Sequence, residues 1–240
     1  MNALENNRYT SGWVEAVKNI EKPAAILAIS AHWETFGSKV TSNHQQKTIH
    51  DFHGFPQALF NVEYQPNGAP EIAQRLQEIL PEITLDKTWG LDHGAWSILV
   101  HTHPEADVPV LQLSIDKNKS PREHFEMAKK LQILREENVL IIGSGNIVHN
   151  LRMLDWQGKT EFSWATKFDA AIKKAILEND FASVIEFQKL EGARESVPSL
   201  EHFLPLLYIL ALKKDGEKAA IFNSGIDLAS IAMTCVSINS

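Results

Sequence analysis

Four apolar runs, each bounded by polar or small residues, constrain the fold of this chain more than any other feature. They are AAILAISAH (residues 24–32), VPVLQLSI (108–115), VLIIGSG (139–145) and AAIFNSG (219–225). Continuous apolar runs of this length are typical of strands that are covered on both faces, as in a parallel sheet. The runs therefore predict a layered fold with buried strands at its centre.

The segments around these runs have the periodicity of amphipathic helices. Such patterns cover residues 11–20, 69–80, 120–137, 161–179 and 199–214. Ser120-Pro121-Arg122-Glu123 adds a helix start, because it combines a serine cap, proline at the first helical position and glutamate three residues after the cap. Helices that alternate with buried strands predict an α/β sandwich.

Length and charge limit the domain organisation and the partners. The chain has 240 residues, 44% of them hydrophobic, with no repeat or linker, and we expect one domain over residues 1–240. The net charge of −7 comes from acidic and basic residues mixed along the whole chain. This pattern argues against nucleic acid or an anionic membrane as a partner, and favours a small-molecule substrate.

The sequence also predicts a cytoplasmic protein. Its one cysteine, Cys235, lies in an apolar run, so we expect a buried structural thiol with no internal disulfide. The start MNALENNRYT is too polar for a signal peptide, and no apolar run approaches the roughly 20 residues that span a bilayer.

Four of the ten histidines occupy positions typical of functional sites. His32 closes the first apolar run and His149 follows the third, and ligands of α/β sheets bind beyond the carboxyl ends of strands. His93 precedes a helix expected over residues 95–101, and His202 opens the helix EHFLPLLYILAL, with Glu201 in its first turn. Each alone could be a structural residue that hydrogen-bonds loop amides. Together, His32, His149 and His202 suit a metal ion, although their spacing matches no local metal motif.

The remaining histidines have simpler explanations. His101 and His103 lie at a helix end, where an imidazolium suits the helix dipole. We expect His44 on a loop surface and His124 as a satisfied interface residue, whereas the loop with His50 and His53 is either a pocket lid or ordinary packing.

Other catalytic motifs do not fit. GSGNIV has Val148 where a dinucleotide-binding turn needs its third glycine, and the serine-nucleophile pattern G-x-S-x-G is absent. A buried cysteine makes thiol chemistry a poor explanation. Metal chemistry remains.

Six segments resemble the class III extradiol ring-cleaving dioxygenases, in the DOPA 4,5-dioxygenase branch. They are SAHW (30–33), IHDFHGFPQALF (49–60), WGLDHGAW (89–96), VPVLQLSID (108–116), SGNIVHNLR (144–152) and EHFLPLLY (201–208). The resemblance implies a mixed, largely parallel sheet flanked by helices on both faces. It also implies a non-haem Fe²⁺ enzyme that opens a catechol ring with O2, and Zn²⁺ can take the place of iron in such imidazole-rich sites.

The resemblance also assigns roles to single residues. His32 and His202 resemble metal ligands, and His149 resembles either a further ligand or, as we favour, the acid/base that takes the catechol proton. His93 resembles a group that contacts the substrate or supports the ligands, with a structural hydrogen bond as the alternative. The small residues after VLII would let the backbone turn beside a planar ring that His149 faces.

This chain departs from the family pattern at its start. The pattern begins earlier, with a strand and an HGSP motif whose histidine supplies a metal ligand, so we expect residues 1–240 to lack that strand and that ligand. The start could be an internal methionine or that of a shortened homologue, and metal binding should be weak. His53 stands where a smaller residue is expected, and could narrow the substrate entrance, add a ligand or lie at the surface.

Three functions follow in order of preference. The first is a metal-dependent extradiol dioxygenase for a catechol-type substrate. The second is a zinc hydrolase built on the same residues, and the third is an inactive homologue that retains only aromatic binding or assembly. The sequence predicts neither the particular catechol nor the oligomeric state.

Overall fold

The computed structural model describes residues 2–239, which divide into two compact units. The first unit comprises the chain up to Asn118 together with Lys130–Ser144. The second comprises Lys119–Lys129 and the chain from Gly145 onward. Since the chain passes between the units three times, neither unit is a continuous stretch of sequence.

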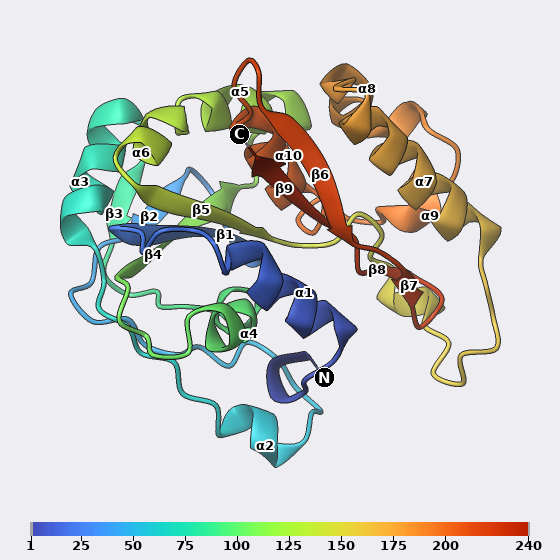
Figure 1. Cartoon of the computed structure of the whole chain (residues 1–240), viewed down its shortest axis with the longest axis horizontal. Helices are drawn as coiled ribbons and strands as arrows, with labels where there is room; N and C mark the ends of the chain where they lie inside the picture. Colours follow the sequence, from blue (N-terminus) through green and yellow to red (C-terminus); the bar gives the residue numbers. More distant parts are fainter. Residues whose placement is uncertain (1, 240) are drawn as a thin grey trace. The chain divides into compact units, whose positions relative to one another are not determined.

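A five-stranded sheet forms the centre of the first unit (Figure 1). Its strands are β1 (Ala25–Thr35), β2 (Lys39–Thr41), β3 (Thr84–Asp86), β4 (Val110–Asp116) and β5 (Val139–Ser144), in the order β3-β2-β4-β1-β5. β1 pairs in parallel with both β4 and β5, β2 pairs in parallel with β3, and β2 meets β4 antiparallel. The predicted mixed, largely parallel sheet is confirmed.

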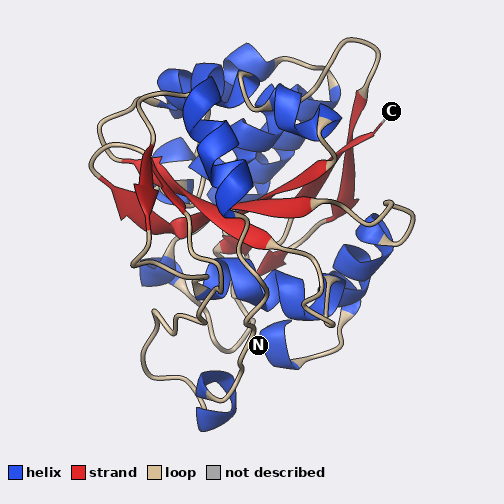
Figure 2. Ribbon diagram, turned by 90° about the vertical axis from the view of Figure 1, so that its left-hand side faces the viewer, coloured by secondary structure: helices blue, strands red, loops and turns tan. Residues whose placement is uncertain are grey.

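Helices cover both faces of this sheet. They are α1 (Arg8–Val17), α3 (Pro70–Ile79), α4 (His93–Thr102) and α6 (Gln132–Glu136). Figure 1 shows α3 and α6 on one side of the strands and α1 and α4 on the other, and in the turned view of Figure 2 helices again lie on both sides. All seven residues of β4 are buried, as expected for a central strand between two helical layers.

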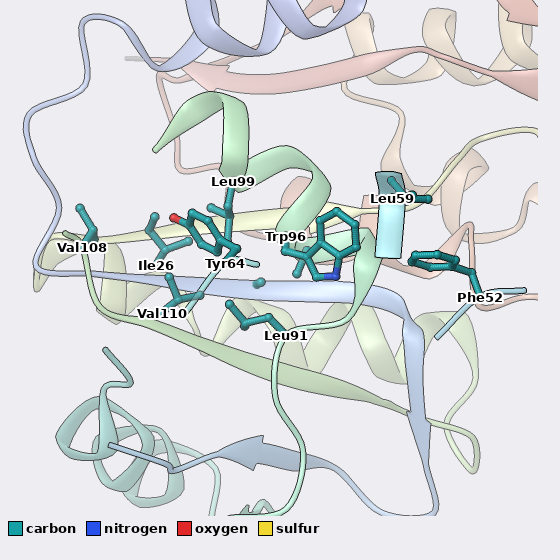
Figure 3. Packing of buried hydrophobic residues seen from close by; sticks show 11 residues of the cluster. Ile26, Phe52, Leu59, Tyr64, Leu91, Trp96, Leu99, Val108 and Val110 are labelled. Atoms are coloured by element: carbon teal, nitrogen blue, oxygen red, sulfur yellow. The ribbon is translucent and has the colours of Figure 1, made fainter. Parts of the chain in front are cut away.

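The core between α4 and the sheet is apolar and rich in aromatic rings (Figure 3). Trp96 and Leu99 of α4 pack with Ile26 of β1 and Val110 of β4, and all four are fully buried. Phe52 lies at one end of this cluster, in the loop before α2 (Gln57–Phe60). The core therefore fixes α4, which begins with His93, and the loop in which Asp51 precedes Phe52.

The second unit is mainly helical. Its helices are α5 (Pro121–Lys129), α7 (Ser163–Leu177), α8 (Phe181–Ile185), α9 (Ala193–Ser196) and α10 (Leu204–Ala211). Two antiparallel pairs complete it, β6 (Lys218–Asn223) with β9 (Cys235–Asn239) and β7 (Ile226–Asp227) with β8 (Ile231–Ala232). Short 3₁₀ turns lie at Asn2–Leu4 in the first unit, and at Leu151–Met153 and Phe187–Lys189 in the second.

Two predictions about this part of the chain were wrong. The run 219–225 forms β6 of a two-stranded antiparallel ribbon with partly exposed residues, instead of a covered parallel strand. Its apolar residues are two alanines, Ile221 and Phe222, and none of them is buried, because the small alanines leave too little apolar surface to require burial on both faces. Cys235 is half-buried on β9, where its sulfur contacts the Met233 carbonyl, so it is not the buried thiol that was expected.

Two helix boundaries also differ from the pattern. The expected helix over 120–137 divides into α5 and α6, and the break falls where the chain passes from one unit to the other. α10 begins at Leu204 instead of residue 199, because Pro205 fits the first turn of a helix, where its missing N–H costs nothing, but not the interior. The predicted cap at Ser120 is confirmed, with the Ser120 N–H donating to Glu123 Oε2 at 2.8 Å.

No helix among residues 2–239 is long and apolar enough to cross a bilayer.

Candidate active site

His32 lies in an irregular part of β1. Pairing with β5 ends at Ser30, opposite Ser144, and the register with β4 shifts between Ile29 and Glu34. The sequence suggested that His32 closes the strand. The strand continues to Thr35, so this prediction was wrong. The interruption of regular pairing leaves the half-buried His32 ring beside α4.

His93 is the first residue of α4, so the helix begins two positions earlier than predicted. The preceding Asp92 caps the helix, because its side chain accepts from the Ala95 N–H at 3.1 Å. The His93 and His32 rings lie next to each other, with centroids 3.9 Å apart. The start of one helix and the irregular strand therefore bring two imidazoles together.

Asp51 joins these two histidines. Its Oδ2 lies 2.9 Å from Nδ1 of His93 and 3.3 Å from Nδ1 of His32, while its Oδ1 accepts the His93 N–H at 2.8 Å. Burial raises the pKa of this carboxyl, but the hydrogen bonds and charges of the two histidines outweigh burial and hold the pKa below its usual value. Asp51 is therefore ionised at neutral pH.

The three side chains fit a divalent metal ion. One potential donor atom from each of His32, Asp51 and His93 lies within 4.8 Å of the others. Two imidazoles and a carboxylate are the donors that non-haem Fe²⁺ oxygenases use, and zinc also accepts them.

A buried polar network lies behind the two histidines. The carboxyl of Asp92 is fully buried and hydrogen-bonds the Gln112 amide and the Ser30 hydroxyl. Burial raises the pKa of Asp92, because these hydrogen bonds do not compensate fully for lost hydration. The Ser30 oxygen in turn accepts the His32 N–H at 3.3 Å. The network thus connects the cap of α4 to the backbone of His32.

The loop IHDFHGFP is held by packing and hydrogen bonds. Phe52 meets the His93 ring edge to face with centroids 5.3 Å apart, and Nε2 of His50 lies 2.9 Å from the Val62 carbonyl oxygen. His53 is exposed, so of the three expectations for this residue the surface position is confirmed. His50 serves the packing of the loop.

In the second unit, His149 and His202 form a stacked pair. Their ring centroids are 3.5 Å apart and the planes differ by 6°. The His149 N–H donates to the Ser196 carbonyl at 2.9 Å, and the His202 carbonyl accepts the Asn146 N–H at 2.7 Å. His202 lies in the turn before α10 and does not open the helix as predicted.

Gly145 permits this arrangement. A Cβ at this position would collide with the His202 carbonyl and lie 3.1 Å from Pro205 Cγ. Gly145 therefore admits the chain's own backbone at His202.

The electrostatics of the pair favour a neutral His149. Burial and, to a smaller extent, the charge of His202 lower the pKa of His149 to about 4, and the opposing charge of Glu201 does not compensate for them. Burial raises the pKa of Glu201, but hydrogen bonds from His202 and Ser199 outweigh burial and bring it to about 2. At neutral pH, His149 is thus an uncharged acceptor and Glu201 an anion that holds His202.

The structure places the remaining histidines as follows. His44 is exposed and His124 is buried against the Tyr208 hydroxyl, as predicted. Nε2 of His101 lies 2.7 Å from the Asn2 carbonyl, and burial lowers the pKa of His103, so the predicted charged, solvated cap is wrong for His103.

Sequence reasoning missed three groups of this site. Asp51, Asp92 and Gln112 were not singled out, although Asp51 and Asp92 each lie next to an aromatic or histidine residue in a quoted motif. The presence of an acidic residue beside a histidine in each of these motifs could have indicated them.

Comparison with known proteins identifies the family of this chain. The family model "Catalytic LigB subunit of aromatic ring-opening dioxygenase" matches residues 5–231. The chain is 43% identical to a 4,5-DOPA dioxygenase extradiol of Escherichia coli, with 99% of this chain and 90% of that protein covered, and 34% identical to one of Beta vulgaris, with 92% and 85% covered.

A solved structure has the same fold. The crystal structure of an uncharacterized Escherichia coli K12 protein matches with a TM-score of 0.84 and 40% identity, over 97% of this chain and 93% of that one. Identity at this level over nearly the whole length shows common ancestry as well as a common fold. The chain therefore belongs to the LigB family of aromatic ring-opening dioxygenases and is an extradiol ring-cleaving enzyme.

Proposed function

We propose that the substrate of this enzyme is a catechol that carries an amino-acid side chain, as in DOPA, and that Fe²⁺ is the working metal. The names of the Escherichia coli, Beta vulgaris and Mirabilis jalapa relatives support the substrate class. The observation that carries the metal proposal is the position of His32, a proposed ligand, in a cluster with the carboxylate of Asp51 and the imidazole of His93. Zn²⁺ is the alternative ion, since imidazole-rich sites also hold zinc well.

The proposed ligands are His32 and His202, with His149 as a ligand or, in the role that we favour, as the acid/base. Glu201 supports His202 as a ligand, because a carboxylate 3.2 Å from Nδ1 orients the ring and fixes its tautomer. When bound, Fe²⁺ supplies the electron transfer that lets a catechol react with O2. The protein residues must then bind the ring and move its protons.

His149 is suited to proton transfer. With a pKa of about 4, its imidazole is neutral at pH 7 and can accept the proton of a catechol hydroxyl. Its conjugate acid then returns the proton readily during ring opening. We assign to His93 contact with the substrate, with Asp51 fixing its ring.

Oxygen uptake tests the proposed roles. Wild-type enzyme loaded with Fe²⁺ should consume O2 with DOPA, and His149→Ala should lower kcat by about 10²- to 10⁴-fold with unchanged metal content. His202→Ala should lose metal, and His44→Ala, at an exposed position, should match the wild type.

Two results would contradict these assignments. Full oxygen uptake by His149→Ala would remove its acid/base role, and turnover of unrelated catechols but not DOPA would remove the substrate class. Ester or amide hydrolysis without O2 consumption would favour the zinc hydrolase instead.

We also propose that residues 1–240 act as one catalytic domain in the cytoplasm. The matched family model spans residues 5–231 and therefore includes parts of both units. A reducing compartment suits a chain whose single cysteine cannot form an internal disulfide. Fractionation of cells that produce the protein tests the location.

A further inference from the structure

We propose that Asp51 is a positioning residue and not a metal ligand. Its carboxylate holds both His32 and His93 as the tautomer with a proton on Nδ1, which places the electron pair of each ring on Nε2, the atom that we assign to the metal in His32 and to the substrate in His93. This inference rests on the proposed role of His32 as a ligand. It concerns a residue that the sequence motifs did not single out.

Both oxygens of Asp51 are already engaged by donors. Oδ1 accepts the His93 N–H at 2.8 Å, and Oδ2 lies 2.9 Å from Nδ1 of His93 and 3.3 Å from Nδ1 of His32. An ionised carboxylate can only accept hydrogen bonds, so the ring nitrogens that face it must carry protons. A neutral imidazole has one N–H, and Nε2 of both rings is consequently an electron-pair donor.

The hydrogen bond from the His93 N–H also opposes movement of the Asp51 carboxylate toward a metal ion. His93 begins α4, and the first N–H groups of a helix have no partner within it. Asp51 satisfies one of them and places a negative charge at the positive end of the helix dipole. Coordination through Oδ1 would leave this N–H without that acceptor.

The loop that carries Asp51 is fixed to the body of the first unit. The Ile49 N–H donates to the Leu91 carbonyl at 2.8 Å, and the Ile49 carbonyl accepts from the Trp96 indole at 2.9 Å. Phe52, with 6% of its surface exposed, packs against Trp96 and Phe60. The chain on both sides of Asp51 thus holds the carboxylate against the two rings.

The alternative is a triad in which His32, Asp51 and His93 all bind the ion. In that arrangement Oδ2 of Asp51 would lose its hydrogen bonds from the two imidazole rings and bind the metal instead. Histidine ligands of metal sites generally donate their other ring N–H to a carboxylate or carbonyl, and loss of such a partner weakens metal binding about 10- to 100-fold. The two arrangements therefore predict different ring tautomers and different effects of removing the charge.

The first test reads the tautomers directly. Long-range ¹⁵N–¹H correlation spectra of metal-free protein, at mildly alkaline pH, should show His32 and His93 protonated on Nδ1. In Asp51→Ala, at least one ring should change to the Nε2-protonated form. Asp107→Asn is the matched control, because this exposed carboxylate pairs with Lys22 and touches neither ring. Nε2-protonated rings in the wild type would overturn the proposal.

The second test uses Co²⁺ as a spectroscopic probe. Asp51→Asn keeps the shape of the side chain, and should bind Co²⁺ with unchanged stoichiometry and visible spectrum but about 10- to 100-fold more weakly. A changed spectrum, as expected when a ligand is lost, would show that Asp51 binds the metal. If Asp51→Ala does not fold, Asp51→Asn still decides the question.

The two proposals can fail separately. The tautomers are measured without metal, substrate or turnover, so their result stands even if the enzyme does not act on catechols. If His32→Ala binds Co²⁺ as tightly as the wild type, His32 is not a ligand and the proposed function must be revised, while the tautomer result still tests the role of Asp51.

Discussion

Gly94 shows at the residue scale how closely His32 is packed against α4. A Cβ at this position would lie 2.8 Å from Cδ2 of His32 and would collide with the Ser30 hydroxyl. The obstacles are the His32 ring and the Ser30 hydroxyl, so any residue larger than glycine must displace Ser30 or the proposed metal ligand His32.

Gly94→Ala should therefore weaken metal binding and turnover together. We expect a loss of about 1–3 kcal/mol in the free energy of unfolding from overpacking, and Co²⁺ affinity lower by about 10-fold or more, because His32 must move. Denaturant titration and Co²⁺ binding measure the two effects.

Gly37→Ala is the control for Gly94→Ala. Gly37 has a φ of +78° with open space around it, so alanine there strains the backbone without touching the site. It should lose stability but keep its Co²⁺ affinity. Equal metal affinity in both variants would contradict the role of Gly94.

The histidines of the site were identified from the sequence, but the contact of Asp51 with them was not. His32, His93, His149 and His202 lie in settings where packing alone does not explain a histidine. Asp51 acts on a ring 42 positions away, and nothing in its own segment indicates that partner. Only the packing of the loop on α4 brings the two together.

At the scale of elements, the sequence predicts what local physics controls. β1, β4 and β5 follow from apolar runs that only a covered strand can bury, and α3 and α7 from regular helical periodicity. The start of α10 depends on Pro205, and the break between α5 and α6 on a change of unit. Periodicity cannot report a change of packing partner.

The start of α4 combines a helix cap with a buried network, and substitution can separate the two. Asp92→Ala removes the side-chain acceptor of the Ala95 N–H, and the buried Gln112 amide and Ser30 hydroxyl each lose a hydrogen-bond partner. We expect a loss of about 2–4 kcal/mol, the sum of about 1 for a cap and 1–3 for unsatisfied buried groups. Chemical denaturation measures the loss.

Asp180→Ala provides the comparison for Asp92→Ala. Asp180 caps α8 through the Ser183 N–H at 3.1 Å in an exposed position, so its loss should cost about 1 kcal/mol. Asp92→Asn should destabilise less than Asp92→Ala, because a neutral side chain suits a site where burial raises the pKa of the acid. Equal losses for the two alanine variants would mean that the network contributes nothing.

At the scale of the whole molecule, the functional groups are distributed over both units. His32, Asp51 and His93 belong to the first, whereas His149, Glu201 and His202 belong to the second. The sequence predicted one domain without a linker, but it could not show three passages between units, since these depend on long-range packing. Each unit contributes its own titratable groups to global stability.

His149 makes the stability of the metal-free protein depend on pH. Its pKa falls from an ordinary 6.5 to about 4 on folding, so the unfolded chain binds this proton more readily. Stability is therefore complete above about pH 6.5 and declines as the pH falls from there toward 4. The decline amounts to at most about 3 kcal/mol, and to less where water still reaches the ring.

His149→Gln should flatten this decline. Glu201 acts in a lower window, since its pKa of about 2 means that its contribution is lost only as the pH falls from about 4.5 toward 2. His103, whose pKa burial also lowers, shares the upper window and should keep part of the slope in the variant. Urea denaturation of metal-free protein between pH 7 and 4.5 measures the difference.

His44→Gln is the control for His149→Gln, because His44 is exposed and should leave the wild-type slope intact. If both variants keep that slope, His149 is accessible enough to titrate as in the unfolded chain. His149 would then be neutral at pH 7 only because the ordinary histidine pKa lies near 6.5. As the general base it would become charged at a higher pH, so catechol turnover would be lost as the pH falls through about 6.5.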